Sequence, residues 1–415
     1  MATLNKKNLP AALDRAIRKT PVVDFHTHLF TPCHGPVCWW GIDDLLTYHY
    51  LVTEAFLYLS MKPGDFYGFP KKKQAEIVWK TLFLDRTPVS EACRGVLTCL
   101  SRFGLDPSER RLEKLRSFYG KFNVETFMDK VFSLANVRAV YMTNDPLDPD
   151  ERKVWLRGHA EDARFRRALR VDNFFRNAAF SRETLKADGF PCDDSLDEKS
   201  MKNVRKFFEH WCGVIRPEYI AASLPPDFEY PSLSNPYAKM VRDVMLPVAR
   251  ERKLPVALMI GVRRLVNPPL RAAGDGMGVA NVRALENLVR ENPDLLFLCT
   301  MIARENQNEL AVASLKFPNL KIFGCWWFMN NPGFIEEITR MRLELLGTGF
   351  IPQHSDCRVV DQLLYKWDHS RTVISQVLAE KYGLLLDAGF RLTEERIRND
   401  VELLLSGNAE KWIRG

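Results

Sequence analysis

Short hydrophobic runs alternate with longer amphipathic segments along most of the chain. The runs are rich in Val, Ile, Leu and Phe, whereas the segments between them repeat their apolar positions with the period of a helix. This alternation predicts a parallel sheet wrapped by helices. Eight runs are expected to form strands: Val22–His26, Val137–Thr143, Ala168–Asp172, Tyr219–Leu224, Pro255–Gly261, Leu295–Thr300, Leu320–Cys325 and Phe350–Gln353. Eight strands with helices between them indicate an α/β fold, the (β/α)8 barrel, whose active site lies where the strands end.

The first two runs are far apart, with roughly 110 residues between them. We expect residues 35–120 to form a helical, lid-like insertion over the mouth of the barrel. Its predicted helices are Lys72–Leu84, Val89–Phe103 and Ser108–Tyr119. Thr87 and Pro88 should occupy the cap and the first turn of the second of these helices.

The end of the chain also carries helix signals. Thr393 is a predicted N-cap for a helix over Glu394–Ser406, and Gly407 should stop that helix. No internal repeat, low-complexity tract or linker marks a second unit. Residues 1–415 are therefore expected to form a single barrel domain.

The composition is that of an ordinary globular protein, with 46% hydrophobic and 27% charged residues. Lys and Arg outnumber Asp and Glu by 59 to 52, a net charge of +7, but the excess is dispersed. The densest basic run, Lys71–Lys73, opens a predicted amphipathic helix, where a solvated face is the simpler interpretation. We therefore expect no nucleic-acid partner. Since no stretch of about 18 uncharged apolar residues occurs, no membrane partner is expected either.

Residues 1–20 mix charges and lack an apolar run of the signal-peptide type. The nine cysteines form an odd set without a Cys-x-x-Cys pair, which argues against a disulfide framework and against a zinc ribbon. Both features are consistent with a cytoplasmic protein. The sequence leaves a homo-oligomer open.

The first predicted strand ends in a His-x-His pair, His26 and His28. Because side chains alternate along a strand, both imidazoles should point to one face, which is the interior of a barrel. Two converging imidazoles form half of a site for zinc or a similar divalent ion. The alternative is a pair of histidines satisfied by hydrogen bonds near a strand end.

A carboxylate at the end of the last predicted strand would supply the third ligand of this metal site. Asp356 lies there, and the first and last strands are neighbours in a closed barrel. His26, His28 and Asp356 are therefore expected to hold one divalent ion, Zn²⁺, and to leave a position for water or substrate. A helix cap or a surface turn is the alternative for Asp356. No histidine occurs over residues 211–353, so the barrel lacks ligands for a second ion.

Arg358 lies two residues beyond Asp356. Its planar guanidinium suits a carboxylate or another substrate oxygen, and a surface position on the last barrel helix is the alternative. Two further blocks have plain structural interpretations. His49 and Tyr50 would belong to a half-buried lid helix, and Trp326 with its aromatic neighbours would pack in the core, although aromatic faces also line sugar pockets.

Together these motifs resemble the uronate isomerases of the amidohydrolase superfamily, over nearly the whole chain. The His-x-His pair alone would indicate only the superfamily, whereas a Trp-Trp-Phe block followed by Asp-x-Arg is specific to uronate isomerases. The blocks that carry the resemblance are Asp24–Leu29, Tyr48–Tyr50, Met142–Pro146, Arg170, Gly324–Phe328 and Ser355–Arg358.

The resemblance implies an isomerase that interconverts a hexuronate aldose and its ketose with one zinc ion. The substrate pairs of the family are D-glucuronate with D-fructuronate and D-galacturonate with D-tagaturonate. By this similarity His26, His28 and Asp356 bind the metal. His49 and Tyr50 would face the sugar.

The resemblance also implies that Arg170 and Arg358 bind the charged and polar oxygens of the sugar, and that Trp326 forms a wall. We expect proton transfer through a cis-enediolate, with Tyr50 or a group beside it acting at C2 and His49 assisting ring opening. A basic tyrosine requires a nearby cation, which the metal or Arg358 would supply. The expected catalytic set is His49, Tyr50, Asp356 and Arg358.

Departures from the family pattern indicate a divergent subgroup. Met259 stands on the fifth predicted strand where other members carry a histidine, and Tyr48–Thr53 replaces their Asp-His-Tyr-Lys-Trp-Arg block. Two rival functions belong to other classes. One is a mononuclear metal-dependent hydrolase or decarboxylase on the same barrel, which would change the mass of its product. The other is a non-catalytic binder of anions or nucleic acid, against which the dispersed charge argues.

Overall fold

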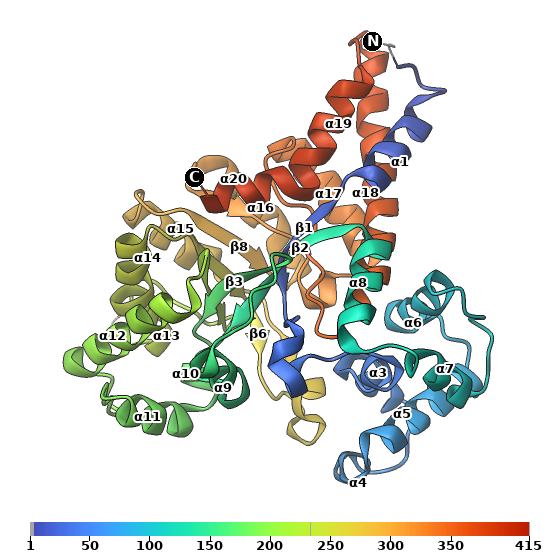
Figure 1. The fold of residues 1–415 in the computed structure, drawn as a ribbon. Coiled ribbons are helices and arrows are strands. Elements are labelled where there is room, and N and C mark those ends of the chain that lie inside the picture. Colours follow the sequence, from blue (N-terminus) through green and yellow to red (C-terminus); the bar gives the residue numbers. More distant parts are fainter. Residues whose placement is uncertain (1–3, 233, 415) are drawn as a thin grey trace.

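The computed structural model describes residues 4–232 and 234–414, so both ends of the expected 1–415 domain lie outside the described residues. Seven parallel strands curl into one sheet in the order β1-β2-β3-β4-β5-β8-β9 (Figure 1). A short antiparallel pair, β6 and β7, follows β5. The sheet strands overlap the first seven predicted runs and confirm the α/β barrel. The strands are β1 Val22–Thr27, β2 Val137–Asn144, β3 Phe165–Arg170, β4 Tyr219–Leu224, β5 Val256–Ile260, β6 Val262–Arg263, β7 Gly276–Met277, β8 Phe297–Met301 and β9 Leu320–Ile322.

The eighth predicted strand, Phe350–Gln353, is reduced to a single bridge between Ile351 and Phe323. The Ile351 amide donates to the carbonyl oxygen of Ile322 at 3.0 Å. Pro352 follows directly, and because proline has no amide hydrogen the ladder cannot continue. The expectation of a full strand here is therefore wrong, and the run is an extended segment.

This extended segment nevertheless closes the barrel. Beyond the bridge, the amide of Asp356 donates to the carbonyl oxygen of His26 at 3.2 Å, and the amide of His28 donates to that of Cys357 at 2.7 Å. These bonds join the last segment to β1. The two ends of the expected metal site are thus fixed to each other by the backbone.

Helices surround the sheet (Figure 1). The longest, α18, packs against the N-terminal helix α1, against α17, and against α6 and α8 of the insertion described below. The helices outside the insertion are α1 Leu9–Lys19, α9 Pro149–Arg157, α10 Asn173–Arg176, α11 Ala178–Ala187, α12 Glu198–Ile215, α13 Pro236–Met240, η3 Val241–Met245, α14 Leu246–Arg252, η4 Pro268–Gly274, α15 Val282–Glu291, η5 Arg304–Asn306, α16 Gln307–Lys316, η6 Trp327–Met329, α17 Pro332–Leu346, α18 Gln362–Asp387, α19 Glu394–Glu402, η7 Leu403–Gly407 and α20 Asn408–Arg414.

The long segment between β1 and β2 is helical in the described residues. Its first predicted helix is α5 continued by a π-helical turn, and its third begins at Leu112 rather than Ser108. The expected Thr87-Pro88 cap of the second helix is wrong, because the Ser90 side chain accepts the amide hydrogen of Cys93 and caps α6 instead. The elements are η1 Pro32–Val37, α2 Ile42–Leu46, α3 His49–Ala55, α4 Pro63–Gly68, α5 Lys71–Trp79, η2 Lys80–Leu84, α6 Glu91–Arg102, α7 Leu112–Tyr119 and α8 Val124–Ala135.

At the C-terminal end, Thr393 caps α19 by accepting from the amide of Arg396, as predicted. The predicted stop at Gly407 is wrong. Gly407 lies inside a π-helical turn that runs on into α20. It does not have the positive φ of a helix-ending glycine.

The basic run at the start of α5 is neutralised locally. Lys71 pairs with Asp44, Lys72 Nζ lies 3.6 Å from Glu113, and Lys73 Nζ lies 3.4 Å from Glu76. This supports the solvated face expected from the sequence. Among the described helices, none is both long and apolar enough to cross a membrane.

Candidate active site

The carboxyl end of β1 and the closing segment bring three metal-binding side chains together. His26 Nε2 lies 3.6 Å from Asp356 Oδ1, and His28 Nε2 lies 3.4 Å from the same oxygen. One ligand atom from each residue lies within 4.8 Å of the other two. The structure therefore assembles the trio expected from the sequence.

The two histidines do not converge through regular strand alternation. Phe25 belongs to the cluster that fills the barrel interior, and its ring stacks on Tyr219 with centroids 4.9 Å apart. The register between β1 and β2 shifts between Asp24 and Thr27. Such irregularities are common beside active sites because they re-aim side chains. This one allows His26 to reach the site although its neighbour Phe25 also faces inward.

The atoms that would bind an ion lack other partners. Both ring nitrogens of His26 and the Oδ1 atom of Asp356 are buried without a hydrogen-bond partner among the described residues. Leaving buried polar atoms unpaired is costly, so each such atom needs an explanation. A divalent cation would satisfy Asp356 Oδ1 and the His26 nitrogen that faces it at once. Two imidazoles and one carboxylate also leave a coordination position open, as in catalytic zinc sites. The residues present therefore fit a divalent ion.

His28 is oriented by the neighbouring strand. The Thr143 hydroxyl donates to the carbonyl oxygen of Thr27 at 3.0 Å and lies 2.8 Å from His28 Nδ1. The same Nδ1 atom lies 3.3 Å from Arg170 Nη1, and Nε2 faces Asp356 Oδ1. Burial lowers the pKa of His26 to about 3 and that of His28 well below 6.5. Both imidazoles are thus neutral, the form that binds metals.

The carboxylate ligand is held by its backbone. Asp356 has φ = +55°, the left-handed region in which Asp is better tolerated than most residues. Its neighbour Ser355 donates its amide hydrogen to Asp24 Oδ1 at 3.0 Å, and Trp367 Nε1 donates to Asp24 Oδ2 at 2.8 Å. Asn330 Nδ2 donates to the Ser355 carbonyl oxygen at 3.0 Å. The ligand is therefore positioned without any ion.

A cavity of about 350 Å³ opens above the trio. It lies between the strand ends and the helical insertion. All eight residues singled out from the sequence line it: His26, His28, His49, Tyr50, Arg170, Trp326, Asp356 and Arg358. Fifteen residues that were not assigned to the site also line it: Phe30, Trp39, Tyr48, Thr143, Asp145, Asp148, Glu151, Asn173, Arg176, Ser223, Met259, Arg264, Ala272, Asp275 and Trp327.

The insertion contributes His49 and Tyr50 from the first turn of α3. Their rings lie edge to face with centroids 4.4 Å apart, and the His49 ring lies 5.5 Å from that of Trp327. Burial lowers the pKa of His49 to about 4, so at neutral pH its imidazole is uncharged. Its Nε2 atom has no hydrogen-bond partner among the described residues. Burial, together with the nearby Tyr48 and Asp356, raises the pKa of Tyr50 well above 10.

Two of the cavity's arginines are already engaged by carboxylates. Arg170 Nε donates to Asp172 at 2.8 Å, and Arg264 Nη1 donates to Asp275 at 2.7 Å. By contrast, the Arg176 side chain has no ion-pair or hydrogen-bond partner in residues 4–232 and 234–414. Burial lowers the pKa of Arg176, and the charges of Arg170 and Arg264 lower it further. An anion in the cavity would relieve that repulsion.

Arg358 is not on the surface of the last barrel helix. It lies before α18, and its Nη1 donates to the carbonyl oxygen of His28 at 3.0 Å. The guanidinium carbon lies 4.4 Å from the ring centroid of Trp39 and 5.1 Å from that of Phe30. Two aromatic rings and a backbone carbonyl oxygen hold the Arg358 guanidinium at the wall of the cavity. Its other N–H groups remain available to a ligand.

Arg176 and Met259 show what sequence reasoning could have found. Arg176 ends α10, the short helix after β3, at the face where a barrel places its active site, and this position was the only available signal. Met259 lies near the end of β5 and also lines the cavity. Its thioether supplies no imidazole at this strand end.

No protein-family model matches the chain, and a search of curated proteins gives no match. Among solved structures, a uronate isomerase from Bacillus halodurans C-125 has 46% sequence identity and a TM-score of 0.96, covering 100% of this chain and 98% of that one. A uronate isomerase from Thermotoga maritima (15% identity, TM-score 0.76, covering 100% of both chains) shares the fold. So does a glucuronate isomerase from Caulobacter crescentus (15%, 0.76, covering 99% of this chain and 94% of that one). At 46% identity over its whole length, and with the motifs of that family gathered around one cavity, the chain belongs to the uronate isomerases.

Proposed function

We propose that this protein interconverts D-glucuronate with D-fructuronate or D-galacturonate with D-tagaturonate, using one divalent ion held by His26, His28 and Asp356. Zinc is the expected ion, because two imidazoles and a carboxylate around an open position are a typical catalytic zinc set. One observation carries the proposal. The trio lies at the floor of a cavity whose wall presents Arg176, an arginine with no ion-pair partner among the residues that the structure describes. Membership of the uronate isomerase family supports the reaction class.

Arg176 is the proposed anchor for the substrate carboxylate. A planar guanidinium binds a carboxylate through two parallel hydrogen bonds, and Lys or a neutral donor cannot reproduce that geometry. Arg170 and Arg358 have donors left after their protein contacts and are proposed to bind further oxygens of the sugar. Trp326 supplies an apolar wall. These contacts orient C1 and C2 toward the floor.

Moving hydrogen between C1 and C2 as a proton requires a base at C2 and a proton source at C1. His49 is uncharged, has a free ring nitrogen and faces the cavity, so it can accept a proton during ring opening. Tyr50 lies beside it as a neutral phenol. We propose that Tyr50, or His49 next to it, exchanges the C2 proton through a cis-enediolate, and that a basic Tyr50 needs a neighbouring cation. The bound ion would supply Lewis-acid stabilisation of the developing oxyanion.

The test is a panel of hexuronates incubated with metal-loaded protein and followed by NMR. We expect aldose and ketose to interconvert with unchanged mass. D-Glucose and D-galactose, which lack the carboxylate, are matched control substrates and should react far more slowly. A product of altered mass would instead support the rival hydrolase or decarboxylase.

Two additions make the test specific. Arg176→Met should lower kcat/KM for the hexuronate by roughly 10- to 200-fold, because charge-assisted hydrogen bonds contribute about 1.5–3 kcal/mol, and should leave the slow hexose reaction unchanged. An equal loss on both substrates would remove Arg176 from carboxylate binding. In D₂O, proton transfer should place deuterium at C1 of the ketose or C2 of the aldose. No deuterium after prolonged equilibration, with near-normal activity of Tyr50→Phe, would contradict the enediolate route.

All nine cysteines are free thiols. Free thiols persist in reducing compartments, so we propose a cytoplasmic location. Expression in an oxidising compartment should then lower the yield of active enzyme relative to the cytoplasm. Equal specific activity and thiol content in both would contradict this.

A further inference from the structure

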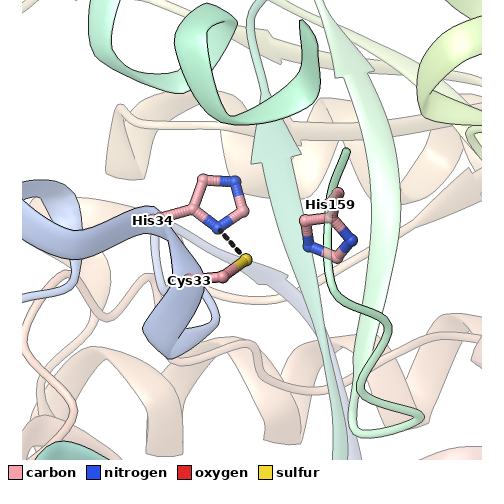
Figure 2. Close-up of side chains that lie close together, drawn as sticks. All are labelled: Cys33, His34 and His159. Carbon is pink, nitrogen blue, oxygen red and sulfur yellow. Dashed lines mark hydrogen bonds between the residues drawn. The ribbon is translucent and has the colours of Figure 1, made fainter. Parts of the chain in front are cut away.

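A second group of metal-binding side chains lies outside the trio. Cys33 and His34 belong to η1, directly after β1, and His159 lies just beyond α9, in the segment that leads to β3. Figure 2 shows the thiol and the two imidazoles gathered between these neighbouring segments. The isomerase proposal gives these residues no role.

The geometry matches a transition-metal site. One ligand atom from each residue lies within 4.8 Å of the other two, and Cys33 Sγ lies 3.7 Å from His34 Nδ1. Tetrahedral zinc, with bonds of about 2.3 Å to sulfur and about 2.05 Å to nitrogen, separates those two atoms by roughly 3.6 Å. The pair thus already has the required spacing. The ligand atom of His159, which lies within 4.8 Å of the other two ligand atoms, would need to move closer to them to complete the tetrahedron.

One hydroxyl now occupies the centre of the group. Thr31 Oγ1 lies 3.0 Å from Cys33 Sγ, 2.9 Å from His34 Nδ1 and 3.3 Å from His159 Nε2. A hydroxyl has one hydrogen, so it can donate to only one of three neighbours. The hydroxyl can accept from the other two, and Cys33 Sγ and His34 Nδ1 also form a weak hydrogen bond with each other. The three potential ligand atoms therefore already converge on one point, where a cation would replace neutral hydrogen bonds by coordination bonds.

Both imidazoles are in the form that binds metals. Burial lowers the pKa of His34 to about 4, and the nearby His159 adds to this shift. Burial, reinforced by the Arg167 charge, also lowers the pKa of His159. Stacking fixes the ring of His159 against Trp155, with centroids 4.3 Å apart and planes 16° apart. Cys33, in contrast, is solvent-exposed, which gives an ion a route in.

We propose that Cys33, His34 and His159 form a second divalent-metal site, selective for zinc-like ions and completed by a water at the exposed side of Cys33. Thiolate and imidazole ligands favour zinc over magnesium or calcium. Binding replaces the thiol hydrogen by the metal–sulfur bond, so one proton leaves to solvent for each ion bound. No oxidant or reductant is involved.

An ion bound to Cys33, His34 and His159 would link two segments that line the active-site cavity. Phe30 and Trp39 flank η1, whereas α9 contributes Asp148 and Glu151. The His34 ring packs on Phe30 with centroids 5.0 Å apart, and Phe30 packs under Arg358. A metal here would therefore restrain the wall that holds Arg358, at a distance from the reacting atoms.

Cobalt(II) is the probe, because a cobalt–thiolate bond gives an intense charge-transfer absorption in the near ultraviolet that nitrogen and oxygen ligands do not give. Full-length protein is stripped with a chelator, titrated with cobalt, and its bound metal is measured. We expect about two ions per chain and a thiolate band in the wild type. Cys33→Ser should remove the band and one ion. His159→Gln should do the same, with His210→Gln as the matched histidine control.

The two sites are separable in this experiment. A variant of the trio, His26→Asn, should lose one ion and keep the thiolate band. If wild-type protein shows no thiolate band at saturating cobalt, or if Cys33→Ser binds as much metal as the wild type, the group is only a hydrogen-bond network around Thr31 and the proposal is overturned. Either result leaves the isomerase proposal standing, since that depends on product identity.

Discussion

The trio His26, His28 and Asp356 and the group around Cys33 offer the same number of metal ligands in different surroundings. In the trio, both His26 nitrogens and Asp356 Oδ1 are buried and have no hydrogen-bond partner in the described chain. Around Cys33, a threonine hydroxyl faces every ligand atom. The difference teaches that counting ligands does not predict how tightly a site binds its ion. What matters is whether the ligand atoms have another way to be satisfied.

The two groups also differ in what carries them. The trio lies on β1 and on the segment that closes the barrel, and backbone hydrogen bonds join the two. The Cys33 group lies on a short 3₁₀ segment and a loop. Sites on rigid elements keep their geometry without the ion, whereas sites on loops gain order from it. We therefore expect the trio to bind metal more tightly than the Cys33 group.

The largest effect should come from emptying the trio. His26→Ala combined with His28→Ala removes two of three ligands, and the loss of Lewis-acid stabilisation worth several kcal/mol should lower kcat/KM by about a thousandfold or more. Elemental analysis should show one ion fewer. Cys33→Ser is the contrasting variant, which should lose one ion and keep isomerase activity. Undiminished metal in the double variant would refute the assignment of the trio.

Arg358 lies between the two groups, and its substitution should have the next largest effect on activity. Arg358→Met removes charge-assisted hydrogen bonds of about 1.5–3 kcal/mol, so kcat/KM should fall roughly 10- to 200-fold. Circular dichroism and thermal melting check that the fold survives. A loss smaller than about threefold with an intact fold would show that Arg358 only supports the wall.

Substituting two threonines should affect the two metal sites differently. Thr143→Val removes the hydroxyl that orients His28, and the loss of such a partner typically weakens metal binding by about 10- to 100-fold. Thr31→Val removes the hydroxyl that competes with an ion around Cys33, so zinc affinity there should stay the same or rise. Competition against a fluorescent chelator measures both. Weaker binding at the Cys33 group in Thr31→Val would mean that the hydroxyl supports the site instead of competing with the ion.

The smallest effect concerns His49, a half-buried histidine with no candidate ion. Its pKa is about 4 in the folded protein and 6.5 in the unfolded chain. Between these pH values the unfolded chain binds more protons, so the free energy of unfolding falls as pH falls below 6.5. From pH 7 to pH 5 the histidine should cost on the order of 2 kcal/mol. Urea unfolding at both pH values should show a smaller change for His49→Gln, and an unchanged difference would contradict a neutral His49.

The sheet could be predicted well because buried parallel strands appear in the sequence as continuous apolar runs. β4 matches its predicted run at both ends, since Tyr219–Leu224 is uninterrupted. β3 begins at Phe165, earlier than predicted, because Arg166 and Arg167 break the apolar pattern. Both arginines form ion pairs outside the strand, with Glu410 and Glu161. The sequence pattern could not reveal those distant partners.

The residues of the site could be predicted where a strand end or a motif places them. They could not be predicted where a backbone irregularity or a contact between distant segments places them. His26, His28 and Asp356 follow from strand ends that a barrel must bring together. The register shift at Asp24–Thr27 that aims His26 has no sequence signal. The Cys33 group was not predicted either. His159 is separated from Cys33 and His34 by β2 and α9, and no sequence spacing connects these residues.

The closure of the barrel by its last segment has a consequence for synthesis. Asp356 is placed by a backbone bond to His26, which lies 330 positions earlier in the chain. At about 5–20 residues per second, a ribosome needs tens of seconds to make the residues between them. During that time the two histidines are exposed on a nascent chain without their carboxylate partner. The proposed metal site therefore assembles only near the end of translation, and we expect a chain truncated before Asp356 to bind no divalent ion at these two histidines.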